Sequence, residues 1–255
     1  RRPVAVKIVR SSEKYYESAL IEADILRDIN RRGGAGTSLC VRLLGQFDMR
    51  GHCCLVFERL GQSVYDYLKL NGYRGFPLEL VRELSRQLLE ALRFLHGFGL
   101  VHTDLKPENI LFCDAESAAW NNGDQYGGDG ELVLPKSSRI KVIDFGGATY
   151  KDDHKSSIVN TRQYRAPEVI LGTGWCCPSD LWSLGCIIAE MYQGDLLFET
   201  HDNTEHIALI ERCVGPFPPR MVERSRVGHK YFDSRGRARG AKAGRKESQE
   251  RIRRM

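Results

Sequence analysis

Residues His102–Asn109 have the sequence His-Thr-Asp-Leu-Lys-Pro-Glu-Asn, and further along the chain Ile143–Gly146 has the sequence Ile-Asp-Phe-Gly. Transfer of a phosphoryl group needs a carboxylate that orients the attacking hydroxyl, and cations that neutralise the charge on the phosphate oxygens. Asp104 can supply the carboxylate, and Lys106 can place a positive charge beside it in an extended loop. These two stretches therefore predict a site for phosphoryl transfer.

Two further residues of these stretches carry oxygen ligands of the kind that Mg²⁺ takes in proteins, namely Asn109 and Asp144. An isolated Asp-Phe-Gly is a weak signal, because a buried Phe beside a turn Gly usually marks only the end of a strand. The spacing of His102, Asp104, Lys106 and Asn109 ahead of it makes the pattern specific. We therefore predict Asn109 and Asp144 as metal ligands.

Three more motifs flank the two stretches in a fixed order: Val-Ala-Val-Lys at Val4–Lys7, Ala-Pro-Glu at Ala166–Glu168 and Asp-Leu-Trp-Ser-Leu-Gly at Asp180–Gly185. In this order the five motifs resemble a eukaryotic protein kinase. The resemblance implies an α+β, two-lobed protein-kinase-like fold, with a small β-rich N-lobe and a mainly helical C-lobe. It also implies ATP and Mg²⁺ as cofactors.

The resemblance divides the chain into a partial N-lobe with the hinge at residues 1–60, a C-lobe at residues 61–232 and a basic tail at residues 233–255. We expect the tail to be disordered, because it is poor in apolar residues. The C-lobe carries a polar, Gly- and Asn-rich stretch at residues 114–138, expected to be a surface insertion. We expect the glycine-rich loop that covers ATP phosphates and the last part of the C-lobe, with the Arg partner of Glu168, to be lacking.

The alternation of residues 4–9 places Ala5 and Lys7 on one face of a predicted strand. The resemblance makes Ala5 a lid over the adenine and Lys7 the ligand of the α- and β-phosphates. Residues 13–30 predict a helix, and Glu22 lies beside its apolar stripe. By resemblance Glu22 pairs with Lys7, and the alternative is an exposed Glu that pairs along its own helix.

The resemblance assigns four residues further along the chain to the nucleotide site. Phe57 is the bulky gatekeeper at the back of the adenine pocket, and Glu58 and Leu60 belong to the hinge whose backbone holds the adenine. Leu111, in a predicted short strand, is a further nucleotide contact.

Thr161 lies in the segment from Asp144 to Glu168, which by resemblance is the activation segment. Its hydroxyl is expected to bond Asp104 and Lys106, so we predict these three residues as the catalytic group. His102 is expected to be a packed core histidine against the Phe of Asp-Phe-Gly.

Residues Glu205–Arg212, Glu-His-Ile-Ala-Leu-Ile-Glu-Arg, resemble the run Glu-His-Leu-Ala-Met-Met-Glu-Arg for which the LAMMER (CLK) kinases are named. The three differing positions exchange one apolar residue for another, and the alternative is a plain amphipathic helix. The LAMMER resemblance implies dual-specificity transfer to Ser/Thr and Tyr. It also implies protein substrates that are basic, Arg/Ser-rich splicing factors, and a location in the nucleus, with the cytoplasm as a second location.

Composition fits a globular protein, because 42% of the 255 residues are hydrophobic and no apolar run is long enough to cross a membrane. The eight cysteines form no Cys-x-x-Cys pair, so we expect reduced and mostly buried thiols. Residues 220–255 hold 13 Lys/Arg against 4 Asp/Glu, and residues 1–219 hold 25 against 29. The basic tail predicts contact with nucleic acid or an import factor, or else a solvated tail, and the acidic body suits a basic substrate.

Two functional hypotheses follow. The chain is an active LAMMER-type kinase, or it is a catalytically impaired kinase fragment that acts as a binding module or arises from an incomplete gene model. We expect this chain to bind Mg-ATP weakly, because without a glycine-rich loop the phosphates lose backbone donors and Lys7, Asn109 and Asp144 face water.

Overall fold

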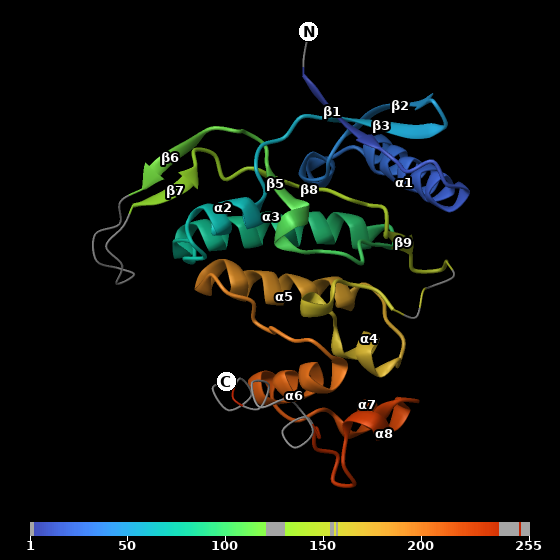
Figure 1. Cartoon of the computed structure of the whole chain (residues 1–255), viewed down its shortest axis with the longest axis vertical. Helices are drawn as coiled ribbons and strands as arrows, with labels where there is room; N and C mark the ends of the chain where they lie inside the picture. The colour runs from blue at the N-terminus through green and yellow to red at the C-terminus, as the bar shows by residue number, and fades with distance from the viewer. Residues whose placement is uncertain (1–2, 121–130, 154–155, 157, 240–249, 251–255) are drawn as a thin grey trace.

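The chain folds into a small upper lobe built on a three-stranded sheet and a larger, mainly helical lobe below it (Figure 1). The computed structural model describes residues 3–120, 131–153, 156, 158–239 and 250. The predicted α+β, two-lobed arrangement is confirmed.

The upper sheet is antiparallel, with the strand order β1–β3–β2. Its strands are β1 (Val4–Ile8), β2 (Leu43–Met49) and β3 (His52–Glu58). Strands β2 and β3 join at Arg50 and Gly51, whose φ angles of 51° and 80° suit the tight two-residue turn of a twisted hairpin. The register places Ala5 opposite Phe57, so the predicted adenine-contacting residues face each other across two strands.

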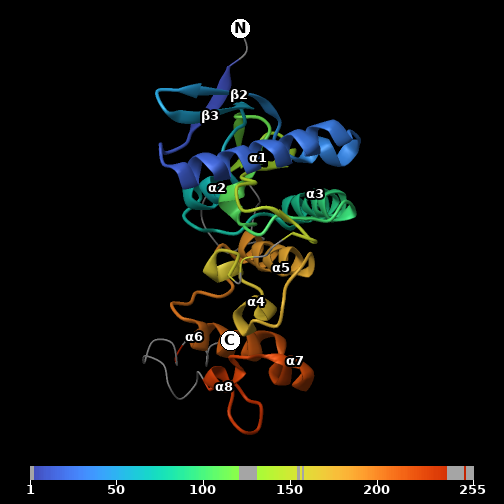
Figure 2. The ribbon, with the colours of Figure 1, turned by 90° about the vertical axis from the view of Figure 1, so that its right-hand side faces the viewer.

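Helix α1 (Glu13–Arg32) packs against β2 and β3, below the sheet in Figure 2. Its buried face includes the predicted apolar stripe, of which Leu26 and Ile29 are fully buried. Burial of each such side chain contributes about 1.5–3 kcal/mol. Glu22 lies on the same buried face and is only 4% exposed. The helix ends at Gly33, where a φ of 67° favours glycine.

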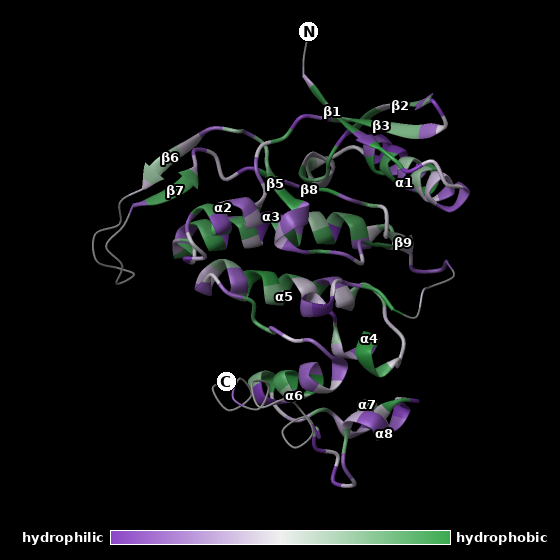
Figure 3. Ribbon diagram, viewed as in Figure 1, coloured by the Kyte–Doolittle hydropathy of each residue, from purple (hydrophilic) through white to green (hydrophobic). Residues whose placement is uncertain are grey.

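The lower lobe is built from seven helices within the described part of the chain: α2 (Val64–Leu70), α3 (Leu78–Gly97), α4 (Pro167–Leu171), α5 (Pro178–Gln193), α6 (Asn203–Val214), α7 (Pro219–Arg224) and α8 (Gly228–Tyr231). Both views place α5 between α3 on one side and α4 and α6 on the other (Figures 1 and 2). Hydrophobic residues gather along α5 (Figure 3). Leu181, near the start of this helix, is 47% exposed.

Short strands and 3-10 turns carry the chain past the interface between the lobes. The strands form three antiparallel pairs: β4 (Leu100–Val101) with β9 (Thr149–Tyr150), β5 (Ile110–Phe112) with β8 (Ile140–Val142), and β6 (Ser117–Trp120) with β7 (Leu132–Pro135). The 3-10 turns are η1 (Ala35–Leu39), η2 (Pro107–Asn109) and η3 (Arg162–Tyr164).

The insertion at residues 114–138 contains a pair of strands that the sequence did not predict. Strands β6 and β7 pair within it, and the side chains of Leu132 and Leu134 are buried. Asn71, which caps α2, clamps β7: its Nδ2 donates to the carbonyl of Val133 at 2.9 Å and its Oδ1 accepts from the amide of Val133 at 2.8 Å. Residues 121–130 lie outside the described residues.

The predicted disordered tail also needs a correction. Residues 233–239 form a turn in which Oδ1 of Asp233 accepts hydrogen bonds from the amides of Arg235 and Arg237, at 2.8 and 3.0 Å. The amide of Ala238 then donates to Glu211 of α6 at 2.9 Å, so this part of the tail is fixed to the lobe. The rest of the predicted tail, apart from Glu250, lies outside the described residues.

The eight cysteines are free thiols. Only half of them are buried, so the expectation that most are buried is wrong: Cys40, Cys53, Cys54 and Cys186 are buried, whereas Cys213 is exposed. In the described ranges, no helix combines the length and apolarity needed to cross a membrane.

Candidate active site

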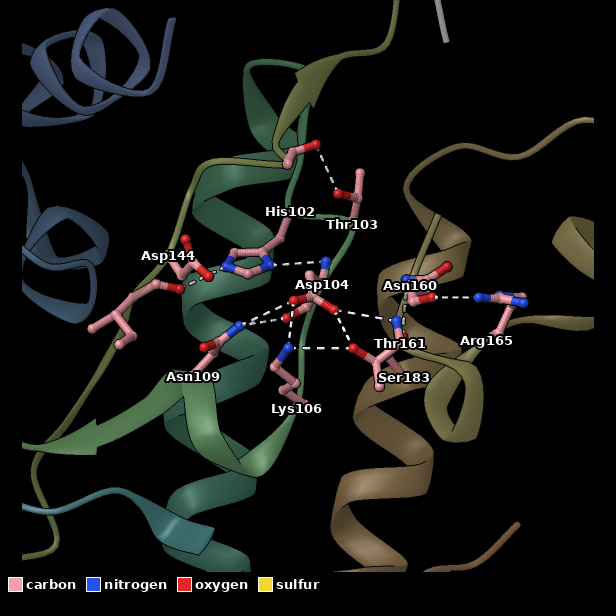
Figure 4. A network of polar contacts seen from close by, with 12 residues as sticks. His102, Thr103, Asp104, Lys106, Asn109, Asp144, Asn160, Thr161, Arg165 and Ser183 are labelled. Atoms are coloured by element: carbon pink, nitrogen blue, oxygen red, sulfur yellow. Dashed lines mark hydrogen bonds and ion pairs between the residues drawn. The ribbon is translucent and has the colours of Figure 1, made fainter. Parts of the chain in front are cut away.

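Asp104 and Lys106, in the loop between β4 and β5, contact Thr161, which lies directly before η3 (Figure 4). Oδ1 of Asp104 accepts a hydrogen bond from the Thr161 hydroxyl at 2.6 Å, and Oδ2 accepts one from Nζ of Lys106 at 2.7 Å. The same Nζ donates to Oγ1 of Thr161 at 3.3 Å. The contact of Thr161 with Asp104 and Lys106, expected from the sequence, is therefore present.

These contacts set the charge of Asp104. Burial alone would raise the pKa of this carboxyl, but the hydrogen bonds from Lys106 and Thr161 and the positive charge of Lys106 lower it below its ordinary value. Asp104 is therefore ionised at neutral pH and can accept a hydrogen bond from an incoming hydroxyl.

Asn109 ends the same loop, and Asp144 follows strand β8. Nδ2 of Asn109 donates to the backbone oxygen of Asp104 at 2.9 Å, which fixes the amide. Asp144 has a φ of 63°, in the left-handed region that Asp and Asn tolerate better than most residues. Mg²⁺ usually takes one or two protein ligands and completes its shell with phosphate oxygens and water. The pair fits this ion, and among the described residues no cluster of three or more His, Cys, Asp and Glu side chains offers a cage for another metal.

Lys7 and Glu22 form the ion pair that the motif order predicts. Nζ of Lys7 lies 2.9 Å from both carboxylate oxygens of Glu22 and 3.1 Å from Oδ1 of Asp144. The alternative of an exposed Glu22 is excluded by its burial. Burial would lower the pKa of Lys7, but the two carboxylates outweigh it and raise this pKa, so the ammonium stays charged.

A cavity of about 410 Å³ opens between the two lobes. Every residue that we predicted for the nucleotide or the metal lines it: Ala5, Lys7, Glu22, Phe57, Glu58, Leu60, Asn109, Leu111 and Asp144. The sequence did not reveal Val41, which also lines the cavity, because it precedes β2 without belonging to a motif. The carboxylate of Glu58 is engaged elsewhere, with Nζ of Lys141 and the amide of Arg42, which leaves its backbone for the cavity.

A model of the protein kinase domain matches residues 1–225. The chain belongs to the protein kinase family. The kinase is 50% identical over 240 residues to the serine/threonine-protein kinase AFC1 of Arabidopsis thaliana, covering 90% of the chain and 50% of that relative. It is 47% identical over 229 residues to the dual specificity protein kinase CLK2 of Homo sapiens, covering 90% of the chain and 45% of that relative.

The crystal structure of another kinase domain superposes on the chain with a TM-score of 0.93 and 41% sequence identity, covering 99% of this chain and 76% of that one. These comparisons confirm the predicted resemblance to the LAMMER (CLK) kinases. The kinase chain spans about half the length of the curated relatives that it matches.

The carboxylate of Asp180, a residue without a predicted role, holds the loop between β4 and β5 in place. It is fully buried at the start of α5 and accepts hydrogen bonds from the amides of His102 and Thr103, at 2.8 and 2.9 Å, and from Nε2 of His96 at 2.9 Å. A buried carboxylate without such partners would be very costly. His102 itself is fully buried and packs edge-on against Phe145, with ring centroids 5.1 Å apart, as expected.

The run that resembles the LAMMER motif forms part of α6 and is mostly interior. Its residues from Glu205 to Ile210 are buried, and Oε2 of Glu205 accepts a hydrogen bond from the amide of His201 at 2.9 Å. The run therefore packs within the lower lobe of the kinase and lines neither the cavity between the lobes nor the one described next.

A second cavity, of about 580 Å³, opens beside Thr161. Four acidic residues line this cavity, namely Glu108, Glu190, Asp195 and Glu199, and we call it the acidic cavity. Its described lining holds no Lys or Arg. Burial raises the pKa of Glu190 to about 7, although the Tyr164 hydroxyl donates to its carboxylate at 2.7 Å. A concave surface with one sign of charge attracts ligands of the opposite sign.

Proposed function

We propose that the chain is an active protein kinase that transfers the γ-phosphoryl group of ATP to Ser or Thr, and in some cases Tyr, of basic proteins rich in Arg and Ser. One observation carries this proposal: Thr161 lines the acidic cavity, and its hydroxyl also donates a hydrogen bond to Asp104. Arg side chains of a substrate, held by the acidic cavity, would bring a neighbouring hydroxyl to Asp104.

In this proposal each site residue has one task. Asp104, ionised and held by Lys106 and Thr161, orients the attacking hydroxyl and accepts its proton. Lys106 places its charge beside the transferred group. Lys7, held by Glu22, binds the α- and β-phosphates.

Asn109 and Asp144 would hold Mg²⁺, which neutralises charge on the phosphate oxygens when bound. Ala5, Phe57, Leu60 and Leu111 would surround the adenine, with the backbone of the hinge as its polar partner.

The identity of the substrates belongs to the same proposal. The charge of the acidic cavity supports any Arg-rich peptide, and the LAMMER resemblance narrows this class to Arg/Ser-rich splicing factors, with a nuclear location. Contact of the basic residues 220–255 with nucleic acid or an import factor stays a prediction.

The test is a phosphotransfer assay with an Arg/Ser-repeat peptide and a matched Glu/Ser-repeat peptide. We expect transfer to the first peptide only, and a rise of up to about fivefold in its KM in the Asp195→Asn variant, because an ion pair of an exposed carboxylate contributes about 0.2–1 kcal/mol. Glu116→Gln is the matched control, since Glu116 is exposed on the hairpin and pairs with Lys136.

Equal transfer to both peptides would contradict the substrate class. Binding of the Arg-rich peptide without any transfer would instead support the impaired binding module.

A further inference from the structure

The C-terminal half of α1 meets the lower lobe through a cluster of four side chains, which we call the α1 anchor: Asp28, Arg32, Phe98 and Tyr150. Oδ2 of Asp28 accepts a hydrogen bond from the Tyr150 hydroxyl at 2.7 Å and pairs with Nη2 of Arg32 at 3.0 Å. The guanidinium of Arg32 lies 4.0 Å from the centroid of the Phe98 ring, which in turn contacts the ring of Tyr150. The anchor thus joins α1 to β9 and to the turn before β4.

The lower side of the anchor is firmly attached to the catalytic frame. Strand β9, which carries Tyr150, pairs with β4 directly before the loop of Asp104. The amide of Lys151 donates to the carbonyl of Gly99 at 2.7 Å. Between Asp144 and β9, the carbonyl of Gly147 accepts the Thr103 hydroxyl at 2.7 Å. Tyr150 therefore belongs to the frame that positions Asp104 and Asp144.

The upper side of the anchor is the helix that carries Glu22. Helix α1 packs mainly on β2, β3 and η1, so it moves with the upper lobe unless something ties it to the lower one. Glu22 and Asp28 are six residues apart on this helix, or about 9 Å at 1.5 Å per residue. A tie at Asp28 therefore limits how far the Glu22 carboxylate can swing from Lys7 and Asp144.

We propose that Tyr150 is a positioning residue for phosphoryl transfer: its hydroxyl, bound to Asp28, holds α1 against β9 so that Glu22 stays paired with Lys7. The inference rests on the proposed kinase function and gives Tyr150 no contact with substrate. The hydroxyl remains a donor at neutral pH, because burial and the Asp28 carboxylate raise the pKa of Tyr150 to about 12. The bond also joins residues 122 positions apart, which no motif spacing reveals.

The test compares two Tyr→Phe variants that each remove one hydroxyl. Tyr150→Phe keeps the ring beside Phe98 and loses the bond to Asp28. Tyr16→Phe is the matched control, because the Tyr16 hydroxyl of α1 donates to Asp48 of β2 at 3.0 Å, within the upper lobe. We expect kcat/KM to fall about tenfold in Tyr150→Phe, equivalent to about 1.4 kcal/mol, and about twofold or less in Tyr16→Phe.

A double-variant cycle separates positioning from general support of the fold. If Tyr150 acts through Glu22, Tyr150→Phe causes no further loss in a Glu22→Gln background. An additional tenfold loss there, or an unchanged rate in Tyr150→Phe alone, would overturn the proposal.

Hydrogen exchange of the α1 amides tests the anchor without any assay of activity. Faster exchange in Tyr150→Phe than in Tyr16→Phe supports the anchor, and equal exchange in the two variants overturns it. If the unaltered chain transfers no phosphate, the proposed function fails, and the exchange comparison still decides the role of Tyr150.

Discussion

Asp104 accepts several hydrogen bonds with a single carboxylate. Oδ1 receives the hydroxyl and the amide of Thr161, at 2.6 and 3.2 Å, and Oδ2 receives Lys106. A carboxylate fixed in this way needs little reorganisation when a hydroxyl arrives, which is the kind of preorganisation that accelerates a reaction. Asp104 does not line the cavity between the lobes, so its fixed carboxylate is available to a hydroxyl and not to a nucleotide in that cavity.

We expect Asp104→Asn to lower the rate of phosphotransfer by about 10²–10⁴-fold, because a general base contributes about that much. Binding of Mg-ATP should change little, since Asp104 does not line the cavity between the lobes. Single-turnover transfer measures the first effect and ATP-dependent thermal shift measures the second. Full transfer by this variant would remove Asp104 from its proposed role.

Glu190 should make the proposed recognition of a basic peptide depend on pH. Its pKa of about 7 means that the carboxyl gains a proton as the pH falls through 7. The acidic and phenolic groups that face it in the cavity are Glu108, Asp195, Glu199, Tyr164, Tyr65 and Tyr73. We expect the KM of an Arg-rich peptide to rise as the pH is lowered from about 8 to about 6, because Arg stays charged while the cavity loses negative charge.

The matched variant for this pH dependence is Glu190→Gln, in which the KM should be high and nearly flat over the same range. An unchanged pH profile in that variant would assign the titration to another group.

Residues close together in a motif were predictable, whereas their distant partners were not. The close spacing of Asp104, Lys106 and Asn109 in one loop indicates from the sequence alone that they act at the same site. Asp180 serves the same loop from 77 and 78 positions further along the chain, so only the folded structure reveals its bonds. The acidic cavity is a similar case, because its carboxylates come from separate segments.

At the scale of elements, Thr103 joins the loop of Asp104 to the segment between Asp144 and Thr161 by two hydrogen bonds between neutral groups. Thr103 stands where many kinases place an Arg that clamps a phosphorylated residue. It has a φ of 70°, donates its hydroxyl to Gly147 and accepts the amide of Asn160 at its carbonyl. Neutral contacts therefore take the place of a charged clamp.

We expect phosphotransfer activity that does not depend on phosphorylation of the activation segment. Position 103 is Thr and not Arg, so no cation at this position needs a phosphate as its partner. Phosphatase treatment, followed by the assay with the Arg/Ser-repeat peptide, should leave the rate unchanged. Mass spectrometry of the treated protein provides the control that phosphate was removed. A collapse of the rate would show that another cation binds a phosphate there.

Long elements were easier to predict than short ones. The periodic apolar residues of α1 span several turns, so their pattern exceeds chance. Strands β6 and β7 have only four residues each, and the stretch between them is rich in Gly and Asn. Their pairing could therefore not be predicted from an apolar pattern. The turn at residues 233–239 was missed because its stability comes from bonds to Asp233 and α6 and not from apolar residues.

Charge distribution at the scale of the whole molecule matches the chemistry of the site. Residues 1–219 carry 25 Lys/Arg and 29 Asp/Glu, and four of the acidic side chains gather in one cavity beside Thr161. Attraction between exposed charges falls as salt shortens the screening length, from about 30 Å at 0.01 M to about 3 Å at 1 M.

We therefore expect the KM of an Arg-rich peptide to rise with salt, because screening weakens its attraction to the acidic cavity. The rise should be steeper than for a peptide of the same length with half of the arginines replaced by glutamine. Steady-state assays across a salt series, with saturating Mg-ATP, measure both slopes. Equal slopes for the two peptides would mean that the cavity does not bind the arginines.

The buried bonds of Asp180 imply an order of events when the chain folds. The carboxylate of Asp180 on α5 holds the loop of Asp104 and is itself bonded by His96 of α3, so we expect the loop to take its final shape only after these helices dock. In a refolding experiment, burial of Trp182 on α5, followed by fluorescence, should precede the return of phosphotransfer. The chemistry would then be the last property that the newly folded molecule acquires.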